Sequence, residues 1–238
     1  MSIEQLVANY HPDQIGIDVV NQSRAVFLAG IMSAGKDALR DELLKSPDYY
    51  DVITHTTRPI RMNSGEIEHD GVNYHFVTSE QMSKLLEEHK MIEINHFGNN
   101  YYGTSVEEFR KANEQGLVVL ENIDIHGVSS MYDIAPQNMT AIFVVPPSYE
   151  TWIKRIVGRY GSVDSFNNEW QNRREITILE LKNALNVPYY HFVINDDLNS
   201  AVEQINNIAH SSDSSANYDD HTARACAVNL LHAIRQMP

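Results

Sequence analysis

The stretch that decides the fold is Gly30-Ile31-Met32-Ser33-Ala34-Gly35-Lys36-Asp37. Four residues separate its glycines and a lysine follows the second, which is the spacing of a phosphate-binding loop. A short apolar run at 25–29 precedes the loop as a buried strand would, and 36–45 is typical of a helix with Leu39 and Leu43 on one stripe. Strand, loop and helix direct backbone N–H groups at an anion, while Lys36 reaches the transferred phosphoryl group. The pattern predicts a nucleotide site, and the alternative is an ordinary glycine turn.

Asp37 departs from this motif, which has Ser or Thr after the lysine. A hydroxyl offers Mg²⁺ one neutral oxygen, whereas a carboxylate offers a charged oxygen that is also a hard ligand. Without the metal, the carboxylate repels the phosphates of a nucleotide. We therefore predict that Asp37 is a metal ligand and that the site is strictly Mg²⁺-dependent.

Length and composition favour one large domain with insertions, because 238 residues with 42% hydrophobic content can bury a full core. The single cysteine, Cys226, excludes an internal disulfide and suits a reducing compartment. No apolar run approaches about 18 residues, and residues 1–19 lack the features of a secretion signal, so we expect a cytoplasmic protein without a membrane anchor. The formal charge of −14 argues against nucleic acid as a partner but not against a small phosphorylated ligand.

Two arginines follow the second predicted strand, at 51–54. Arg58 and Arg61 suit a phosphate monoester, because each guanidinium offers a fork of donors; the alternative is two solvated surface arginines. Residues 71–77 and 91–97 alternate like half-buried strands, and 78–90 predicts a helix that begins at a capping residue. Residues 98–104 predict a turn that carries two tyrosines.

These segments resemble the guanylate kinase family, in the family's order. The similarity runs from about Arg24 to about His210, and its motifs together are specific where the glycine loop alone is not. They are Thr54-His55-Thr56-Thr57-Arg58-Pro59, Gly71-Val72-Asn73-Tyr74-His75-Phe76-Val77, Ile92-Glu93, Asn100-Tyr101-Tyr102-Gly103-Thr104, Val145-Pro146-Pro147-Ser148 and Ile194-Asn195-Asp196-Asp197-Leu198.

The resemblance implies a GMP site in the segment after the second strand. The family's phosphate clamp falls on Arg58, Arg61, Tyr74 and Tyr102, and its guanine-reading groups fall on Thr54, Glu93 and Thr104. A carboxylate can accept from guanine N1–H and N2–H₂ together, and adenine has no such paired donors on that edge. Glu93 would therefore select guanine, because the wrong base leaves a buried charge unpaired.

A further buried strand, at 117–120, leads into Glu121-Asn122-Ile123-Asp124. The guanylate kinase pattern has Asp at the positions of both Asn122 and Asp124, which the resemblance assigns to the acceptor site. If a carboxylate at 122 helps to hold the Mg²⁺ shell or an exocyclic amine, its loss and the gain of Asp37 would conserve charge near the metal. The ribose 1,5-bisphosphate phosphokinase branch resembles this chain at both positions but lacks the guanine-reading Glu, so Glu93 favours GMP.

A third apolar strand, at 141–145, and a helix at 148–157 lead to a polar stretch that resembles the family's mobile lid. Its arginines would neutralise charge that develops on the transferred group. The best matches are Arg155, Arg159 and Arg174, and the last assignment can fall on Arg173, because the stretch is about one helical turn longer than usual. Alternatively, Arg155 and Arg159 solvate a helix end.

A helix at 175–185 and a strand at 190–194 follow, and Asn195 comes at the end of that strand, where nucleotide bases lie in open parallel sheets. Asn195 thus joins the predicted ATP site of Gly30, Ser33, Ala34, Gly35, Lys36 and Asp37.

The predicted fold is an α/β P-loop NTPase fold with a parallel, five-stranded core sheet. The core covers 24–53 and 111–210, the inserted nucleoside-monophosphate-binding domain covers 54–110, and the lid covers 156–175. Residues 1–23 form an extension with helical character only at its start, and 211–220 form a polar linker. Residues 221–237 predict a helix that docks on its own domain or makes a dimer contact, with the apolar face Ala223, Ala227, Leu230, Leu231 and Ile234.

Loop and resemblance together predict an ATP:GMP phosphotransferase with Mg²⁺ as cofactor, monomeric or homodimeric. Lys36, Arg155, Arg159 and Arg174 would be its catalytic residues. We nominate no general base, because the acceptor is already an anion, and the eleven histidines form no cluster with metal-ligand spacing. One alternative is a kinase of another phosphorylated acceptor, such as ribose 1,5-bisphosphate or a modified guanine nucleotide. Another is a non-catalytic guanylate kinase-like binding module, against which the intact Gly30, Gly35 and Lys36 argue.

Overall fold

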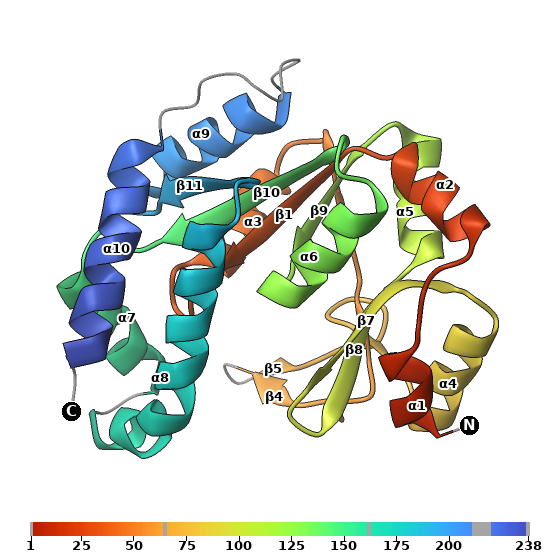
Figure 1. Cartoon of the computed structure of the whole chain (residues 1–238), viewed down its shortest axis with the longest axis horizontal. Coiled ribbons are helices and arrows are strands. Elements are labelled where there is room, and N and C mark those ends of the chain that lie inside the picture. Colours follow the sequence, from red (N-terminus) through yellow and green to blue (C-terminus); the bar gives the residue numbers. More distant parts are fainter. Residues whose placement is uncertain (1, 64–65, 161–162, 211–219, 237–238) are drawn as a thin grey trace. The chain divides into compact units, whose positions relative to one another are not determined.

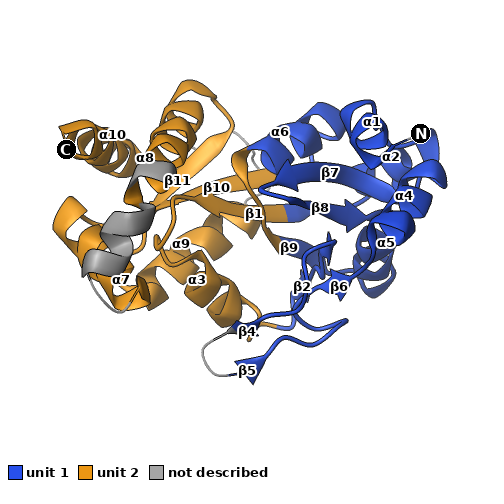
Figure 2. Ribbon diagram, turned by 90° about the horizontal axis from the view of Figure 1, so that it is seen from below, with its two compact units in different colours: residues 1–25, 47–120, 126–139 blue, residues 26–46, 121–125, 140–238 orange. Residues whose placement is uncertain are grey.

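The structure is a computed structural model that describes residues 2–63, 66–160, 163–210 and 220–236. The chain divides into two compact units (Figure 2). Unit 1 comprises residues 1–25, 47–120 and 126–139, and unit 2 comprises residues 26–46, 121–125 and 140–238. The predicted extension at 1–23 and the predicted insert at 54–110 both fall within unit 1.

A five-stranded sheet with the strand order β11-β10-β1-β9-β2 forms the core (Figure 1). Its strands are β1 (Ala25–Gly30), β2 (Tyr49–Asp51), β9 (Val118–Asn122), β10 (Met139–Val145) and β11 (Tyr190–Ile194). The pairs β10–β11 and β2–β9 are parallel, and every residue of β1 is buried, as expected for a strand covered on both faces. The predicted parallel α/β fold is confirmed. The strand predicted at 51–54 is wrong, because β2 ends at Asp51.

The helices of unit 2 are α3 (Lys36–Leu43), α7 (Tyr149–Tyr160), α8 (Val163–Asn186), α9 (Leu198–His210) and α10 (His221–Gln236). The predictions for α3, α7, α9 and α10 are confirmed to within a few residues. The helix predicted at 175–185 is wrong at its start, since α8 begins at Val163 and most of the predicted lid is therefore helical. Residues 161–162 of that lid and residues 211–219 of the predicted linker lie outside the described residues.

α10 packs on α8 and on the edge strand β11 (Figure 1). The five residues predicted for its apolar face are all buried, so docking on its own unit is confirmed. Asp220, just before α10, accepts a hydrogen bond from the backbone N–H of Phe192 (3.0 Å). Arg224 donates to the carbonyl of Tyr190 (2.6 Å) and lies over the Phe192 ring. The start of α10 is thus fastened to the backbone of β11.

Unit 1 holds a second sheet with the order β6-β3-β8-β7 and a separate β4–β5 hairpin. The strands are β3 (His55–Thr56), β4 (Met62–Asn63), β5 (Glu66–Ile67), β6 (His75–Phe76), β7 (Met91–Phe97) and β8 (Asn100–Ser105). The strand predicted at 71–77 is reduced to β6, and most of the turn predicted at 98–104 is wrong, because β8 pairs with β7 from Asn100 onward. The hairpin was not predicted.

The helices of unit 1 are α1 (Ile3–Ala8), α2 (Gln14–Asn21), α4 (Ser79–Glu87), α5 (Val106–Gln115) and α6 (Ile125–Ile134), the last beginning at the boundary of the units. Thr78 and Gln81 form a capping box at the start of α4, which confirms that prediction. The expectation that the N-terminal extension is helical only at its start is wrong, because Asp13 caps α2. The helix α6 was not predicted.

Candidate active site

The glycine loop of unit 2 connects β1 to α3. Gly30 and Gly35 have φ angles of 143° and 96°, a region that favours glycine. A Cβ at Gly30 would meet the carbonyl of Val144, and one at Gly35 would meet the Asn195 amide. Both glycines are therefore required by conformation and by close packing. The buried hydroxyl of Ser33, also at positive φ, has no hydrogen-bond partner and is available to an anion in the loop.

Side chains from α7 and the end of β11 hold the carbonyls of this loop. Trp152 Nε1 donates to the carbonyl of Met32 (2.7 Å), and Arg155 Nη1 and Asn195 Nδ2 donate to the carbonyl of Ala34 (3.2 and 3.0 Å). Because these bonds occupy loop carbonyls, they fix the backbone conformation from which N–H groups can bind phosphate. Asn195 was predicted to contact ATP, but here its amide nitrogen braces the loop.

Lys36 lies folded against the loop, and its Nζ donates to the carbonyls of Gly30 (2.5 Å) and Ile31 (3.3 Å). Burial lowers the pKa of Lys36, and the charges of Glu180 and Asp37 oppose that shift. Burial also raises the pKa of Glu180, a residue of α8, to about 7, while Lys36 and Arg173 act in the opposite direction. Glu180 was not predicted, and no motif marks it.

The two departures from the family pattern are in direct contact. Asn122 Nδ2 donates a hydrogen bond to Asp37 Oδ1 (2.9 Å), and the buried Asn122 Oδ1 has no hydrogen-bond partner. A carboxylate and an unpaired amide oxygen side by side form a donor set that suits a hard cation such as Mg²⁺. Asn122, predicted as an acceptor-site residue, therefore lies beside the loop in unit 2, and Asp124 belongs to the same unit.

A cavity of about 290 Å³ opens beside the loop. It is lined by Met32, Ser33, Gly35, Lys36, Asp37, Arg155 and Arg159. The structure thus brings two of the three predicted lid arginines to the loop. It does not bring Arg174 there, since Arg174 donates to the carbonyls of Ile234 (3.2 Å) and Arg235 (2.8 Å) in the last turn of α10. The neighbouring Arg173, whose charge acts on Glu180, is the better candidate on α8.

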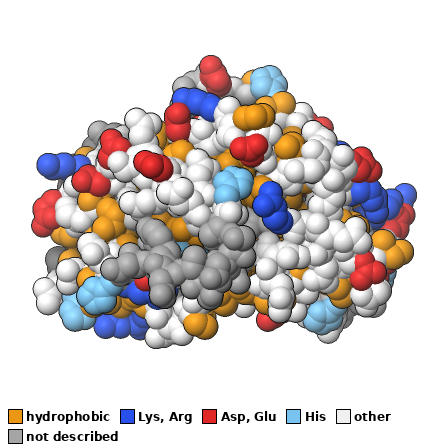
Figure 3. Space-filling model, turned by 90° about the horizontal axis from the view of Figure 1, so that it is seen from above, with side chains coloured by type: hydrophobic (Ala, Val, Ile, Leu, Met, Phe, Trp, Pro, Cys, Tyr) orange, Lys and Arg blue, Asp and Glu red, His pale blue; other side chains and the backbone are white. Residues whose placement is uncertain are grey.

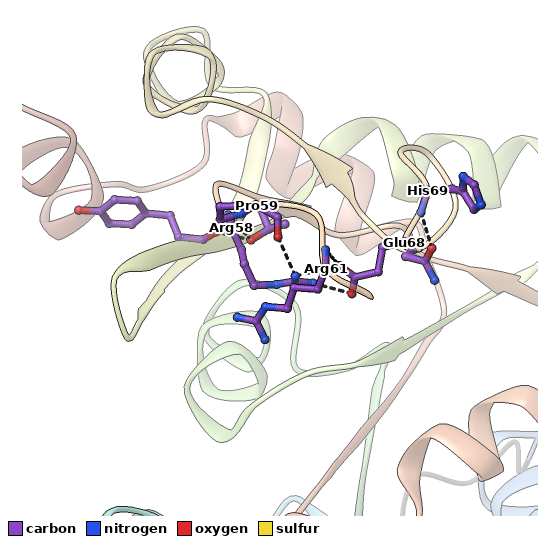
Figure 4. Close-up of polar contacts among 8 residues, drawn as sticks. Arg58, Pro59, Arg61, Glu68 and His69 are labelled. Atoms are coloured by element: carbon purple, nitrogen blue, oxygen red, sulfur yellow. Dashed lines mark hydrogen bonds and ion pairs between the residues drawn. The ribbon is translucent and has the colours of Figure 1, made fainter. Parts of the chain in front are cut away.

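In unit 1, the predicted clamp residue Arg58 is buried and paired with Glu68 (Figure 4). Its Nη1 and Nη2 each donate to one oxygen of Glu68 (both 2.8 Å), and Nη1 also donates to the carbonyl of Pro59 (2.9 Å). Glu68 also accepts from the backbone N–H of Arg61. The Arg58 hydrogen bonds hold the pKa of Glu68 below its ordinary value. Of the five guanidinium N–H donors, these contacts leave Nε–H and one Nη2–H on the same edge, a fork that fits a phosphate.

The two predicted clamp tyrosines lie near that guanidinium. The Cζ atom of Arg58 lies 5.1 Å from the ring centroid of Tyr74. The rings of Tyr74 and Tyr102 meet edge to face, with centroids 6.1 Å apart. Burial raises the pKa of Tyr74. The side chain of Arg61 is exposed. Glu68 was missed by the sequence reasoning, and nothing in the sequence sets it apart from Glu66 and Asp70, the other acidic residues between Arg61 and Gly71.

Two of the three predicted guanine-reading residues, Glu93 and Thr104, are paired on the neighbouring strands β7 and β8. Glu93 of β7 is only 6% exposed, and its Oε1 accepts from the backbone N–H of Thr104 on β8 (2.9 Å). Its Oε2 accepts from Asn95 Nδ2 (2.7 Å). Thr54, the third predicted residue, is half-buried directly before β3, and its backbone carbonyl accepts from the backbone N–H of His75. Glu93 therefore presents a buried carboxylate whose two oxygens are each held by a hydrogen-bond donor.

Next to these strands, His55 and His75 lie opposite each other, with ring centroids 4.6 Å apart. The buried His55 Nδ1 has no hydrogen-bond partner, and His75 Nε2 lies 3.7 Å from Glu108 Oε1. Burial, assisted by His75 and Lys111 and opposed by Glu108 and Asp70, lowers the pKa of His55 to about 4. The neutral imidazole is therefore part of the folded state.

This shift predicts acid sensitivity of unit 1. An unfolded His binds its proton below about pH 6.5, whereas His55 in the folded state binds it only near pH 4, so stability falls as the pH drops through this window. The loss at pH 5 relative to pH 7.5 amounts to about 2 kcal/mol. Urea unfolding at both pH values should show this difference in the wild type and not in a His55→Gln variant. Equal pH dependence of the two proteins would contradict the assignment.

Three further properties of the described residues concern surface charge, metal ligands and membrane-spanning helices. On the face drawn in Figure 3, basic side chains are scattered among acidic ones. No group of three or more His, Cys, Asp or Glu in the described part of the chain is arranged to hold a metal ion. Among the same residues, no helix combines the length and the apolar character that crossing a bilayer requires.

The glycine loop on a parallel α/β sheet defines the class, a P-loop nucleotide-binding protein with a kinase-like arginine-lined cavity. The guanylate kinase family model matches residues 22–212. Similar curated proteins include the guanylate kinases of Corynebacterium efficiens (34% identical, 76% of this chain, 92% of that protein) and Clostridioides difficile (31%, 81% and 89%). The fold is similar to the crystal structure of guanylate kinase from Anaplasma phagocytophilum, with a TM-score of 0.55, 21% identity, and coverage of 79% and 84%. The chain belongs to the guanylate kinase family.

Proposed function

We propose that this protein transfers the γ-phosphoryl group of ATP to GMP, giving ADP and GDP. Relatives that carry the name guanylate kinase match most of this chain and most of their own length, which supports that activity. The observation that carries the acceptor is the buried Glu93 carboxylate, oriented from two sides for a base with adjacent donors. Arg58, fixed by Glu68 with one fork of donors left, supports a phosphate monoester on the same nucleotide.

Each residue has a separate role in this reaction. The loop N–H groups and Lys36 bind the donor phosphates, while Arg155 and Arg159, with Arg173 or Arg174 of α8, neutralise charge on the transferred group. Arg58, Arg61, Tyr74 and Tyr102 hold the phosphate of GMP. Thr54, Glu93 and Thr104 read its base. We assign no general base, because the attacking oxygen belongs to an anionic phosphate.

Mg²⁺ fits the donor set beside the loop. Asp37 Oδ and the orphaned Asn122 Oδ1 are the hard oxygens that would hold it, directly or through water. Bound there, the ion would supply positive charge that offsets the charge of the donor's phosphates. Cytoplasmic location and the choice between monomer and homodimer remain predictions of the sequence.

A coupled assay over several acceptors tests the function. GMP, dGMP, AMP and ribose 1,5-bisphosphate are compared with ATP as donor, with and without Mg²⁺. We expect GMP to be used best, AMP to be a poor acceptor, and no turnover without Mg²⁺. Preferential use of ribose 1,5-bisphosphate would overturn the proposed acceptor, and failure with all four would favour a binding module.

The contact between Asp37 and Asn122 predicts that the two sites are coupled. Asp37→Ser should raise the Mg²⁺ concentration for half-maximal rate about tenfold, since a charged ligand is replaced by a neutral hydroxyl. Asn122→Asp should also be harmful, because it replaces the donor to Asp37 with a second carboxylate. The loss in the double variant should be smaller than the sum of the losses in the two single variants, by about 0.5–3 kcal/mol.

Calorimetry of Mg²⁺ binding with a non-hydrolysable ATP analogue measures the same double-mutant cycle of Asp37 and Asn122 in the absence of turnover. Additive effects in both measurements would refute the coupling. A higher rate for Asp37→Ser alone would mean that Asp37 impairs the loop instead of serving it.

A further inference from the structure

Glu93 and Asn95 lie two residues apart on β7, so their side chains project from the same face of the strand. The carboxylate of Glu93 is held from both sides: Thr104 N–H donates to Oε1 at 2.9 Å and Asn95 Nδ2 donates to Oε2 at 2.7 Å. The first donor is backbone and is independent of side-chain identity. The second depends on the amide of Asn95 alone.

The second hydrogen bond decides the orientation of the carboxylate. The terminal torsion of a glutamate is broad, so a carboxylate held at one oxygen can turn about its last bond. A donor on each oxygen fixes the carboxylate plane. A fixed plane sets the two oxygens at the spacing of the paired N1–H and N2–H₂ donors of guanine, and each carboxylate oxygen can accept more than one hydrogen bond.

The surroundings place Asn95 within the acceptor site. Its cross-strand partner on β8 is Tyr102, a residue of the proposed phosphate clamp, and Asn95 is half-buried. A neutral amide also suits this position better than a charged side chain would. A lysine would pair with Glu93 and compete with the base, whereas an aspartate would repel the carboxylate.

We propose that Asn95 is a specificity-determining residue, which positions the Glu93 carboxylate so that both oxygens read guanine. This inference rests on the proposed function and names a residue of the same site. Asn95 acts through Glu93, so its contribution concerns the base of the acceptor and not ATP or the phosphoryl transfer itself.

The test compares GMP with inosine monophosphate, which keeps N1–H but lacks the N2 amine. The wild type should prefer GMP, because the second carboxylate oxygen of Glu93 is correctly placed for that amine. Asn95→Ala should lower kcat/KM for GMP about tenfold, mainly through KM, because a hydrogen bond to a charged group is lost. The ratio of GMP to inosine monophosphate should fall with it, while KM for ATP stays unchanged.

Two further variants sharpen the result. Asn95→Asp keeps the size but sets two carboxylates side by side, so the loss should exceed that of Asn95→Ala at pH 8 and shrink at lower pH as the pair shares a proton. Asn99→Ala, in the exposed turn between β7 and β8, is the matched control and should leave all constants unchanged. Thermal melts check that each variant is folded.

The outcomes separate the two proposals. If the wild type phosphorylates GMP and Asn95→Ala keeps the ratio of GMP to inosine monophosphate, the role of Asn95 is refuted and the proposed function stands. An equal loss for both acceptors has the same meaning, because it reflects structure and not base reading. If the wild type does not phosphorylate GMP, the proposed function and the inference both fail.

Discussion

In a Lys36→Met variant we expect kcat to fall by about 10²- to 10³-fold. Lys36 is the cation of the loop itself, and its Nζ donates to the carbonyls of Gly30 and Ile31 beside the cavity that it lines. Methionine keeps the length and the burial of the side chain but removes the charge that stabilises the transferred phosphoryl group. Steady-state rates with saturating ATP and GMP measure the effect.

Lys45→Met is the control for Lys36. Lys45 follows the same helix, is exposed and pairs only with the nearby Glu42 among the described residues. Its replacement should change kcat less than twofold, because surface ion pairs contribute about 0–1 kcal/mol even to stability. Activity of Lys36→Met within a few-fold of the wild type would exclude Lys36 from the transfer step.

Glu68→Ala should lower the free energy of unfolding by about 3 kcal/mol, because it leaves the buried guanidinium of Arg58 without its partner. The side chains of Arg58 and Glu68 are only 5% and 9% exposed, and the pair is joined by two hydrogen bonds of 2.8 Å. The KM for GMP should rise at the same time, since the Arg58 fork loses its fixed orientation. Urea unfolding and steady-state kinetics measure the two effects.

Glu66→Ala is the matched control, because Glu66 lies two residues earlier on β5 and is exposed. Its free energy of unfolding should stay within about 0.5 kcal/mol of the wild type. Equal stability of the Glu66 and Glu68 variants would show that the ion pair does not stabilise unit 1. Loss of stability with an unchanged KM for GMP would remove Arg58 from the phosphate clamp.

The parts of the fold that sequence predicted correctly are those with local causes. The buried strand β1 and the glycine loop follow from a continuous apolar run and from two positions that exclude a Cβ. α4 follows from a capping box between Thr78 and Gln81, and α10 from an apolar stripe. In each case the deciding residues lie close together in the sequence.

The contacts that sequence could not predict depend on partners far away in the chain. Arg174 matches the lid motif, yet its donors bind carbonyls 60 and 61 residues further along the chain. Asn195 matches a nucleotide-contact position, yet its amide braces a loop 161 residues away. The contact between Asn122 and Asp37 was suggested only by their two simultaneous departures from the family, a relation between positions and not a local signal.

The fastening of α10 to β11 has a consequence for solubility. An edge strand with unpaired N–H and C=O groups is a template on which strands of other chains can assemble. Here the acceptor for the Phe192 N–H is Asp220 and the donor to the Tyr190 carbonyl is Arg224, so charged side chains occupy bonding positions that a foreign strand would need. Because the family match ends at residue 212, this protection lies outside the shared catalytic fold. A truncation that removes α10 would expose the edge of the sheet at β11. Aggregation would then limit the yield of active protein before any change in catalysis became visible.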